Sequence, residues 1–90
     1  MAHKNQTELE KELNQANQKV LVGGIYSHYK NPRNYYQVIA LGVQEATHKI
    51  CVIYQTQYGG KFIFVRDLDN WLEIVDVKNN KIPRFELVKK

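Results

Sequence analysis

Aromatic rings, amide groups and cations recur through the chain in a mixture that could bind a flat or anionic ligand. Rings stack on bases, and the planar fork of an arginine holds a phosphate or carboxylate through paired hydrogen bonds. We expect seven of these side chains to form a ligand-binding surface: Tyr26, His28, Tyr54, Gln55, Tyr58, Arg66 and Arg84. The alternative is structural, because tyrosine and arginine side chains in small β domains also pack against one another.

Two functional hypotheses make use of such a surface. In the first, the domain is a binding module that recognises nucleic acid, meaning RNA or single-stranded DNA, or a nucleotide-like anionic ligand. In the second, it is a protein–protein interaction module whose aromatic groove docks an extended peptide. The second hypothesis also includes a homodimer formed through an N-terminal helix that carries Leu9, Leu13 and Ala16.

The spacing of the reactive residue types argues against an enzyme and against a metal site. His3, His28 and His48 lie far apart in the sequence and have no cysteine pair to join them. Ser27 is adjacent to His28, so the two side chains would face opposite sides of a strand. Residues 67–70 lack the glycine and the distal glutamate of a calcium loop. We therefore expect no catalytic residue, no metal ligand and no cofactor.

Length and composition limit the chain to one folded core. Ninety residues are at or below the usual size of a single domain. A hydrophobic fraction of 43% with 24% charged residues is typical of globular proteins and not of disordered ones. The net charge of +4 is spread along the chain, which permits a polyanionic partner without requiring one.

Cysteine usage and the N-terminus both favour a cytoplasmic location. The single cysteine, Cys51, lies between apolar neighbours and cannot form an intrachain disulfide, which suits a reducing compartment. The first residues are polar and charged, without an apolar stretch long enough for a signal peptide or a membrane span. We expect no membrane partner.

Residues 1–19 are interpreted as a helical leader. Thr7 and Glu10 have the spacing of a capping box, which predicts a helix from about Glu8 to Asn17. Three apolar residues share one face of this helix: Leu9, Leu13 and Ala16. Because so short a helix is marginal in water, it must dock on the domain or on a partner, or else fray.

From Val20 onward, the hydrophobic pattern alternates with the period of a strand, and turn residues interrupt it. The expected strands cover residues 25–29, 35–43, 49–57, 61–65, 73–77 and 82–88. Residues 61–65 are apolar on both faces, which predicts a central strand covered twice. Residues 31–34 are expected to form a turn, and residues 66–72 one helical or 3₁₀ turn capped by Asp67.

Five or six short strands are too few for two complete sheets, but they can curl so that most edges are hidden. We therefore predict a mainly β fold, namely a small SH3-like, partly open barrel of five or six antiparallel strands with a short N-terminal α-helix. The leader occupies residues 1–19 and the β domain residues 20–90.

Several short motifs occur in the order and spacing of a known family. They are Gly24 to Lys30, Val52 to Gln55, Tyr58-Gly59, Val65-Arg66 and Pro83-Arg84-Phe85. Over residues 23–88 the chain resembles the bacterial family of domains of unknown function numbered 1653, DUF1653. The resemblance implies a short bacterial β domain and assigns no activity to it.

Overall fold

A computed structural model describes residues 4–90 of the chain. The elements in chain order are α1 (Gln6–Lys19), β1 (Ile25–His28), β2 (Asn31–Val43), β3 (Ile50–Thr56), β4 (Ile63–Asp67), α2 (Leu68–Trp71), β5 (Ile74–Val77), β6 (Asn80–Pro83) and β7 (Phe85–Lys89). A five-stranded sheet has the order β4-β3-β2-β1-β7, and β5 and β6 form a separate two-stranded sheet. The predicted mainly β, antiparallel fold with a short N-terminal helix is therefore confirmed, with seven strands rather than five or six.

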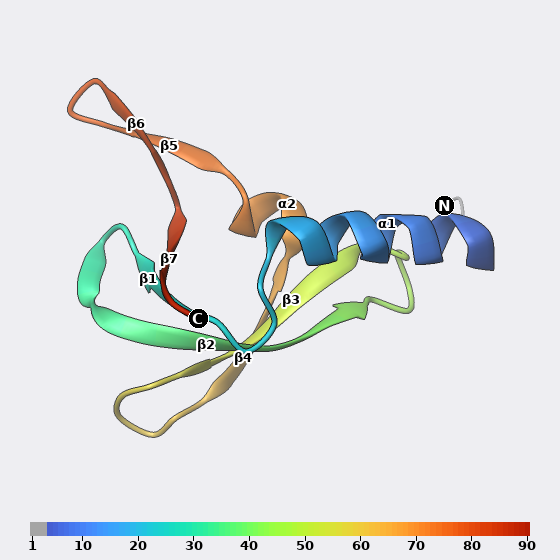
Figure 1. The fold of residues 1–90 in the computed structure, drawn as a ribbon, viewed down its shortest axis with the longest axis horizontal. Helices are drawn as coiled ribbons and strands as arrows, with labels where there is room; N and C mark the ends of the chain where they lie inside the picture. Colours follow the sequence, from blue (N-terminus) through green and yellow to red (C-terminus); the bar gives the residue numbers. More distant parts are fainter. Residues whose placement is uncertain (1–3) are drawn as a thin grey trace.

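The five-stranded sheet is strongly bent but does not close (Figure 1). Its long central strand, β2, pairs with β1 through its first half and with β3 through its second half. A register shift between Val38 and Ala40 marks a bulge at the point where β2 leaves the first partner, and bulges bend the strand that carries them. The two outer strands, β4 and β7, do not pair with each other, so the sheet keeps two edges.

The N-terminal helix docks on the sheet. Asn5 caps it, because the Asn5 side chain accepts a hydrogen bond from the Glu8 amide at 2.8 Å. The prediction that Thr7 is the cap was therefore wrong, and the helix starts two residues earlier than expected. Ala16 is buried, whereas Leu9 and Leu13 are half-exposed, so the domain itself already covers part of the apolar face of α1.

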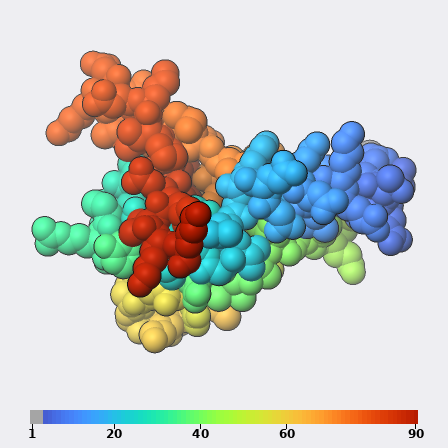
Figure 2. Space-filling model, in the orientation of Figure 1, coloured from blue at the N-terminus to red at the C-terminus, as the bar shows by residue number. Residues whose placement is uncertain are grey.

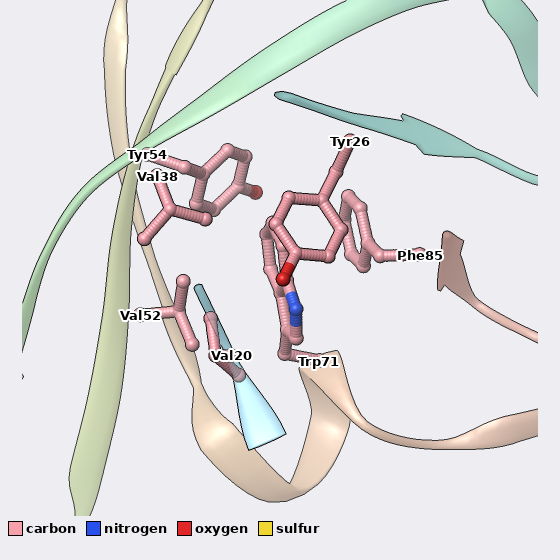
Figure 3. Close-up of a cluster of buried hydrophobic side chains, with 7 residues drawn as sticks. All are labelled: Val20, Tyr26, Val38, Val52, Tyr54, Trp71 and Phe85. Carbon is pink, nitrogen blue, oxygen red and sulfur yellow. The ribbon is translucent and has the colours of Figure 1, made fainter. Parts of the chain in front are cut away.

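The hydrophobic core lies in the hollow of the bent sheet and is closed by α2. Trp71, from α2, occupies its centre, and its indole ring is 2% exposed. Figure 3 shows this ring beside those of Tyr26 and Phe85. The core cluster consists of Val20, Tyr26, Val38, Val52, Tyr54, Trp71 and Phe85. The helical turn predicted after Arg66 thus supplies the largest core side chain.

Residues 61–65 do not form a central strand as predicted. Residues 63–65 begin β4, an edge strand of the sheet, and residues 61–62 precede it. Phe62 and Val65 are each 65% exposed, and Ile63 is 60% exposed. The prediction was wrong because an apolar pattern on both faces of a strand does not require that both faces be covered. No strand among the described residues pairs with the outer side of β4.

The predicted closing hairpin is present, but its second strand is divided between two sheets. β6 pairs with β5, and β7 pairs with β1, so the β5–β6 hairpin projects from the body as an arm (Figures 1 and 2). Lys78 and Asn79 adopt positive φ angles of 51° and 66° at its tip, as a tight hairpin turn requires. At its neck, the Arg84 amide donates to the Glu73 carbonyl at 2.9 Å.

The turn expected at residues 31–34 is also misplaced, because these residues begin β2 and the chain reverses one step earlier, at Tyr29 and Lys30. Asn, Pro and Arg at the start of a strand are compatible with the exposed end of a hairpin.

None of the helices within residues 4–90 has the length and the apolarity needed to cross a bilayer.

Candidate functional site

A half-open pocket of about 240 Å³ lies at the end of the core where β1, β2, β3, β4 and β7 come close together. Side chains from five strands and one loop line it: His28, Tyr36, Tyr54, Tyr58, Phe64, Arg66 and Phe85. Five of these seven are phenyl or phenol rings, and none carries a carboxylate. The pocket therefore combines stacking surfaces with positive charge, which is the combination expected for a planar anion.

The aromatic wall of the pocket is built on Tyr36. Its ring meets the rings of Tyr54 and Tyr58 edge to face, with centroids 5.7 Å away in both cases. The hydroxyl groups of Tyr36 and Tyr58 lie 3.1 Å apart and share a hydrogen bond. Edge-to-face packing holds each ring in one orientation, so the wall is formed before any ligand arrives.

Arg66 brings the cation to this wall and is held there by three contacts. Its Nε donates to the Tyr54 hydroxyl at 3.2 Å, and its Nη1 donates to the Asn70 side-chain oxygen at 2.6 Å. The guanidinium carbon lies 5.0 Å from the centre of the Phe85 ring. Within residues 4–90 neither a carboxylate nor any acceptor for Nη2 is in contact with Arg66. A preorganised arginine without an acidic partner is suited to an external anion.

His28 adds a neutral hydrogen-bond donor to the pocket. Burial lowers the pKa of His28, and the positive charges of Arg66, Arg84 and Lys30 lower it further. Its Nδ1 accepts a hydrogen bond from the Lys30 amide at 3.1 Å, so the proton of the neutral ring resides on Nε2. The three cations that depress this pKa also show that the surroundings of the pocket are positive.

Tyr36 should ionise far later than a free tyrosine. Burial, followed by the hydrogen bond to Tyr58, raises the pKa of Tyr36 from 10.0 to about 12. An acid whose pKa is raised by folding resists ionisation in the folded state, so its contribution to stability is lost as the pH rises above 10. In an alkaline titration followed by tyrosinate absorbance, we expect Tyr36 to ionise late. Tyr58→Phe should lower the pKa of Tyr36 towards 10, because it removes the hydrogen bond.

The matched control is Tyr35→Phe, because Tyr35 is 42% exposed and does not line the pocket. This substitution should leave the late tyrosine in place. If the titration contains no late tyrosine, the hydrogen-bonded aromatic wall described above does not form in solution.

Four of the seven residues predicted from the sequence come together in the pocket: His28, Tyr54, Tyr58 and Arg66. The other lining residues were not in the predicted set: Tyr36, Phe64 and Phe85. Tyr36 lies opposite Tyr26 on one side and Thr56 on the other, and it belongs to no recognisable motif. Alternation along β2 could have placed Tyr36 on the same face as Val38, but not beside Tyr54.

The remaining three predicted residues lie elsewhere. Tyr26 is 5% exposed in the core, where its hydroxyl accepts a hydrogen bond from the Leu21 amide at 2.9 Å. Gln55 follows Tyr54 on β3, so it faces the other side of the sheet, and its amide donates to the Lys61 carbonyl at 2.9 Å.

Arg84 forms an ion pair with Glu73 at 2.6 Å and does not line the pocket. Its side chain is 17% exposed, and its Nε is buried without a hydrogen-bond partner among the described residues. Arg84 therefore fastens the neck of the β5–β6 hairpin and acts on His28 only through its charge.

Within residues 4–90, no three His, Cys, Asp or Glu side chains lie close enough to hold a metal ion. His3 falls outside the described residues. Cys51 is buried, and burial and the nearby Asp67 carboxylate raise the pKa of its thiol, which makes the reactive thiolate scarce.

Comparison with known proteins places the chain in a family. A family model described as "Protein of unknown function (DUF1653)" matches residues 24–87. A crystal structure of a DUF1653 protein from Bordetella bronchiseptica is 29% identical and superposes with a TM-score of 0.67, covering 79% of this chain and 91% of that one. A search among curated proteins found no match. Since the family model covers well over half of the sequence and contains all seven lining residues, the chain belongs to the DUF1653 family.

Proposed function

We propose that this chain is a binding module for a nucleotide unit, taken up from single-stranded DNA, RNA or a free nucleotide. The base stacks against the ring wall formed by Tyr36, Tyr54 and Tyr58, and the phosphate pairs with Arg66. The observation that carries the proposal is the guanidinium of Arg66, which is fixed by Tyr54 and Asn70 and has no carboxylate partner within residues 4–90.

The size and the charge of the pocket both support this ligand class. A volume of about 240 Å³ is small for a drug-sized molecule and suits one base with its phosphate rather than a long buried strand. The cations near His28 attract a phosphate electrostatically. The net charge of +4 is also opposite in sign to that of a polyanion. A cytoplasmic location and a non-enzymatic role form part of the same proposal.

Titration of fluorescently labelled single-stranded oligonucleotides, together with a mononucleotide, tests the proposal. Binding should weaken as salt is raised, because each phosphate contact releases condensed counterions. Tyr58→Ala should weaken binding of the oligonucleotide by about 1–3 kcal/mol, the usual contribution of one stacked base. Tyr58 is 41% exposed, so its truncation should leave the fold intact.

Tyr35→Ala is the matched control, since Tyr35 has nearly the same exposure, 42%, and lies outside the pocket. It should bind like the unmodified chain. Binding that is absent at low salt, or that responds equally to both substitutions, would refute the proposed site. If only the oligonucleotide binds, the ligand is a nucleic-acid strand. If the mononucleotide binds equally well, the ligand is a free nucleotide.

A further inference from the structure

Four consecutive exposed apolar residues lie at the open edge of the sheet, three on β4 and one just before it. Phe62, Ile63, Phe64 and Val65 are 65%, 60%, 46% and 65% exposed. Soluble proteins ordinarily protect an edge strand with charge, proline or cover, because its unpaired backbone groups can pair with another chain. Four consecutive exposed apolar residues on such an edge indicate that something pairs with it.

The backbone groups that this edge offers can be deduced from the ladder on its inner side. The Thr56 amide donates to the Phe62 carbonyl at 3.0 Å, so the backbone groups of Phe62 point towards β3. In an antiparallel ladder these directions alternate along the strand. Phe64 and Arg66 therefore also point inward, whereas the amide and carbonyl groups of Ile63 and Val65 point out from the open edge.

Residues 61–67 are nearly self-complementary when two copies run antiparallel about Phe64. Ile63 then lies opposite Val65 of the second copy, and these are the residues with outward backbone groups. Phe62 lies opposite Arg66, as an aromatic ring facing a guanidinium. Lys61 precedes β4 and turns out of the strand with a φ of 54°, so it forms no ladder pair, but its charge is opposite in sign to that of Asp67 at the other end of β4. Phe64 meets its own equivalent at a position without ladder hydrogen bonds, where side chains approach most closely.

We propose that this chain forms a symmetric dimer in which β4 pairs with β4 of a second copy and joins two five-stranded sheets into one. The charge pattern selects a second copy over an unrelated peptide, because each end of the strand supplies the partner that the other end needs. This inference does not depend on the ligand. It does, however, place Phe62 of the second copy against Arg66, and Phe64 lines the pocket, so the two pockets lie beside the twofold axis.

The opposite edge of the sheet is poorly suited to the same role. β7 is flanked by Arg84 and Lys90 and contains Glu86 and Lys89, and charged residues of this kind protect an edge. Pairing of β4 with β7 of another copy would also be head-to-tail, and such contacts extend into filaments instead of closing. A dimer that does not grow further is therefore the expected assembly.

Sedimentation velocity over a range of protein concentrations tests the proposal without any ligand. The chain should show a reversible monomer–dimer equilibrium, and Val65→Pro should leave only the monomer. A proline at this position removes an amide hydrogen that points outward, so the ladder between β3 and β4 is preserved. A cooperative thermal transition and an unchanged circular-dichroism spectrum would establish that the variant is folded, although its midpoint should fall where the unmodified chain is dimeric. A chain that is monomeric at every concentration, or that assembles beyond the dimer, would overturn the proposal.

An exchange of charges tests the register. Lys61→Asp and Asp67→Lys each place like charges opposite one another at both ends of the symmetric pair, so each variant alone should dimerise at least tenfold more weakly. When the two variants are mixed, opposite charges face each other at both ends, and a heterodimer should form. Lys78→Asp, at the tip of the hairpin arm, is the control and should dimerise normally. If the mixture of the two variants forms no heterodimer, the proposed register about Phe64 is wrong.

Discussion

Replacement of Trp71 by alanine should unfold the domain or leave it on the verge of unfolding. The indole ring is 2% exposed and stacks on Phe85 with centroids 3.7 Å apart and planes 4° from parallel. Removal of a buried tryptophan costs about 3–5 kcal/mol, and a small domain is stable by only about 5–15 kcal/mol in total. Chemical denaturation followed by circular dichroism would measure the loss of free energy of unfolding.

Ile74→Ala is the control for this loss, because Ile74 is also a large apolar residue but is 57% exposed. Surface substitutions usually change stability by about 0.5 kcal/mol or less. A loss for Trp71→Ala no larger than that of the control would contradict a core centred on α2. Since Phe85 also lines the pocket, any Trp71→Ala protein that remains folded should have a loosened ligand site.

Arg66→Ala should weaken nucleotide binding by about 2 kcal/mol, which is roughly thirtyfold, because a hydrogen bond to a charged group contributes about 1.5–3 kcal/mol. Arg66→Lys should recover only part of this loss. A lysine keeps the charge but cannot reproduce the planar fork that Tyr54 and Asn70 orient. The slope of log affinity against log salt should also become shallower for the alanine variant.

Lys11→Ala makes the same change in net charge on the exposed side of α1 and should bind normally. Thermal midpoints should be compared for all three variants, because Arg66 also contacts Tyr54 and Phe85 within the domain. Equal affinity for the Arg66→Ala and Lys11→Ala proteins would show that phosphate recognition, if any, occurs elsewhere. Such a result would leave the β4 dimer untouched, because that pairing is measured without ligand.

The strands were predictable from the sequence where one face is buried and the other is not. β3 shows this alternation in its second half, where Tyr54 and Thr56 are buried and Ile53 and Gln55 are only partly buried, whereas Cys51 and Val52 are both buried. β4 was misassigned because Phe62 to Val65 look the same whether a strand is covered or left at an edge. Chain order alone does not state which strand ends the sheet, and this is decided by long-range pairing.

The helix start was missed for a local reason. Asn5 and Thr7 are both good caps, and the choice between them depends on contacts made after folding. Lys4 donates its amide to His48 Nδ1 at 3.0 Å and pairs with Glu12 at 2.8 Å. These contacts join the loop before β3, the residue before the Asn5 cap and the body of α1, and they favour the earlier start.

The candidate site was predictable in its chemistry but only partly in its membership. Tyr26 and Tyr36 are equally polar and equally aromatic, yet one lies in the core and the other lines the pocket. A phenol can serve in either place, and the curvature of β2 decides between them. The pairing of Arg84 with Glu73 depends on the β5–β6 hairpin, which brings together two residues eleven positions apart.

The contacts between Glu73 and Arg84 also make the β5–β6 hairpin a structurally separate part of the domain. Its two strands pair only with each other. The chain enters the hairpin after Glu73 and leaves it before Arg84, and these two residues are joined by a backbone hydrogen bond and an ion pair. A force or a sequence change at the tip of the hairpin therefore disturbs the hairpin and not the packing of the core. The arm is consequently the place where this domain can lengthen, shorten or acquire a new binding specificity while its sheet stays the same.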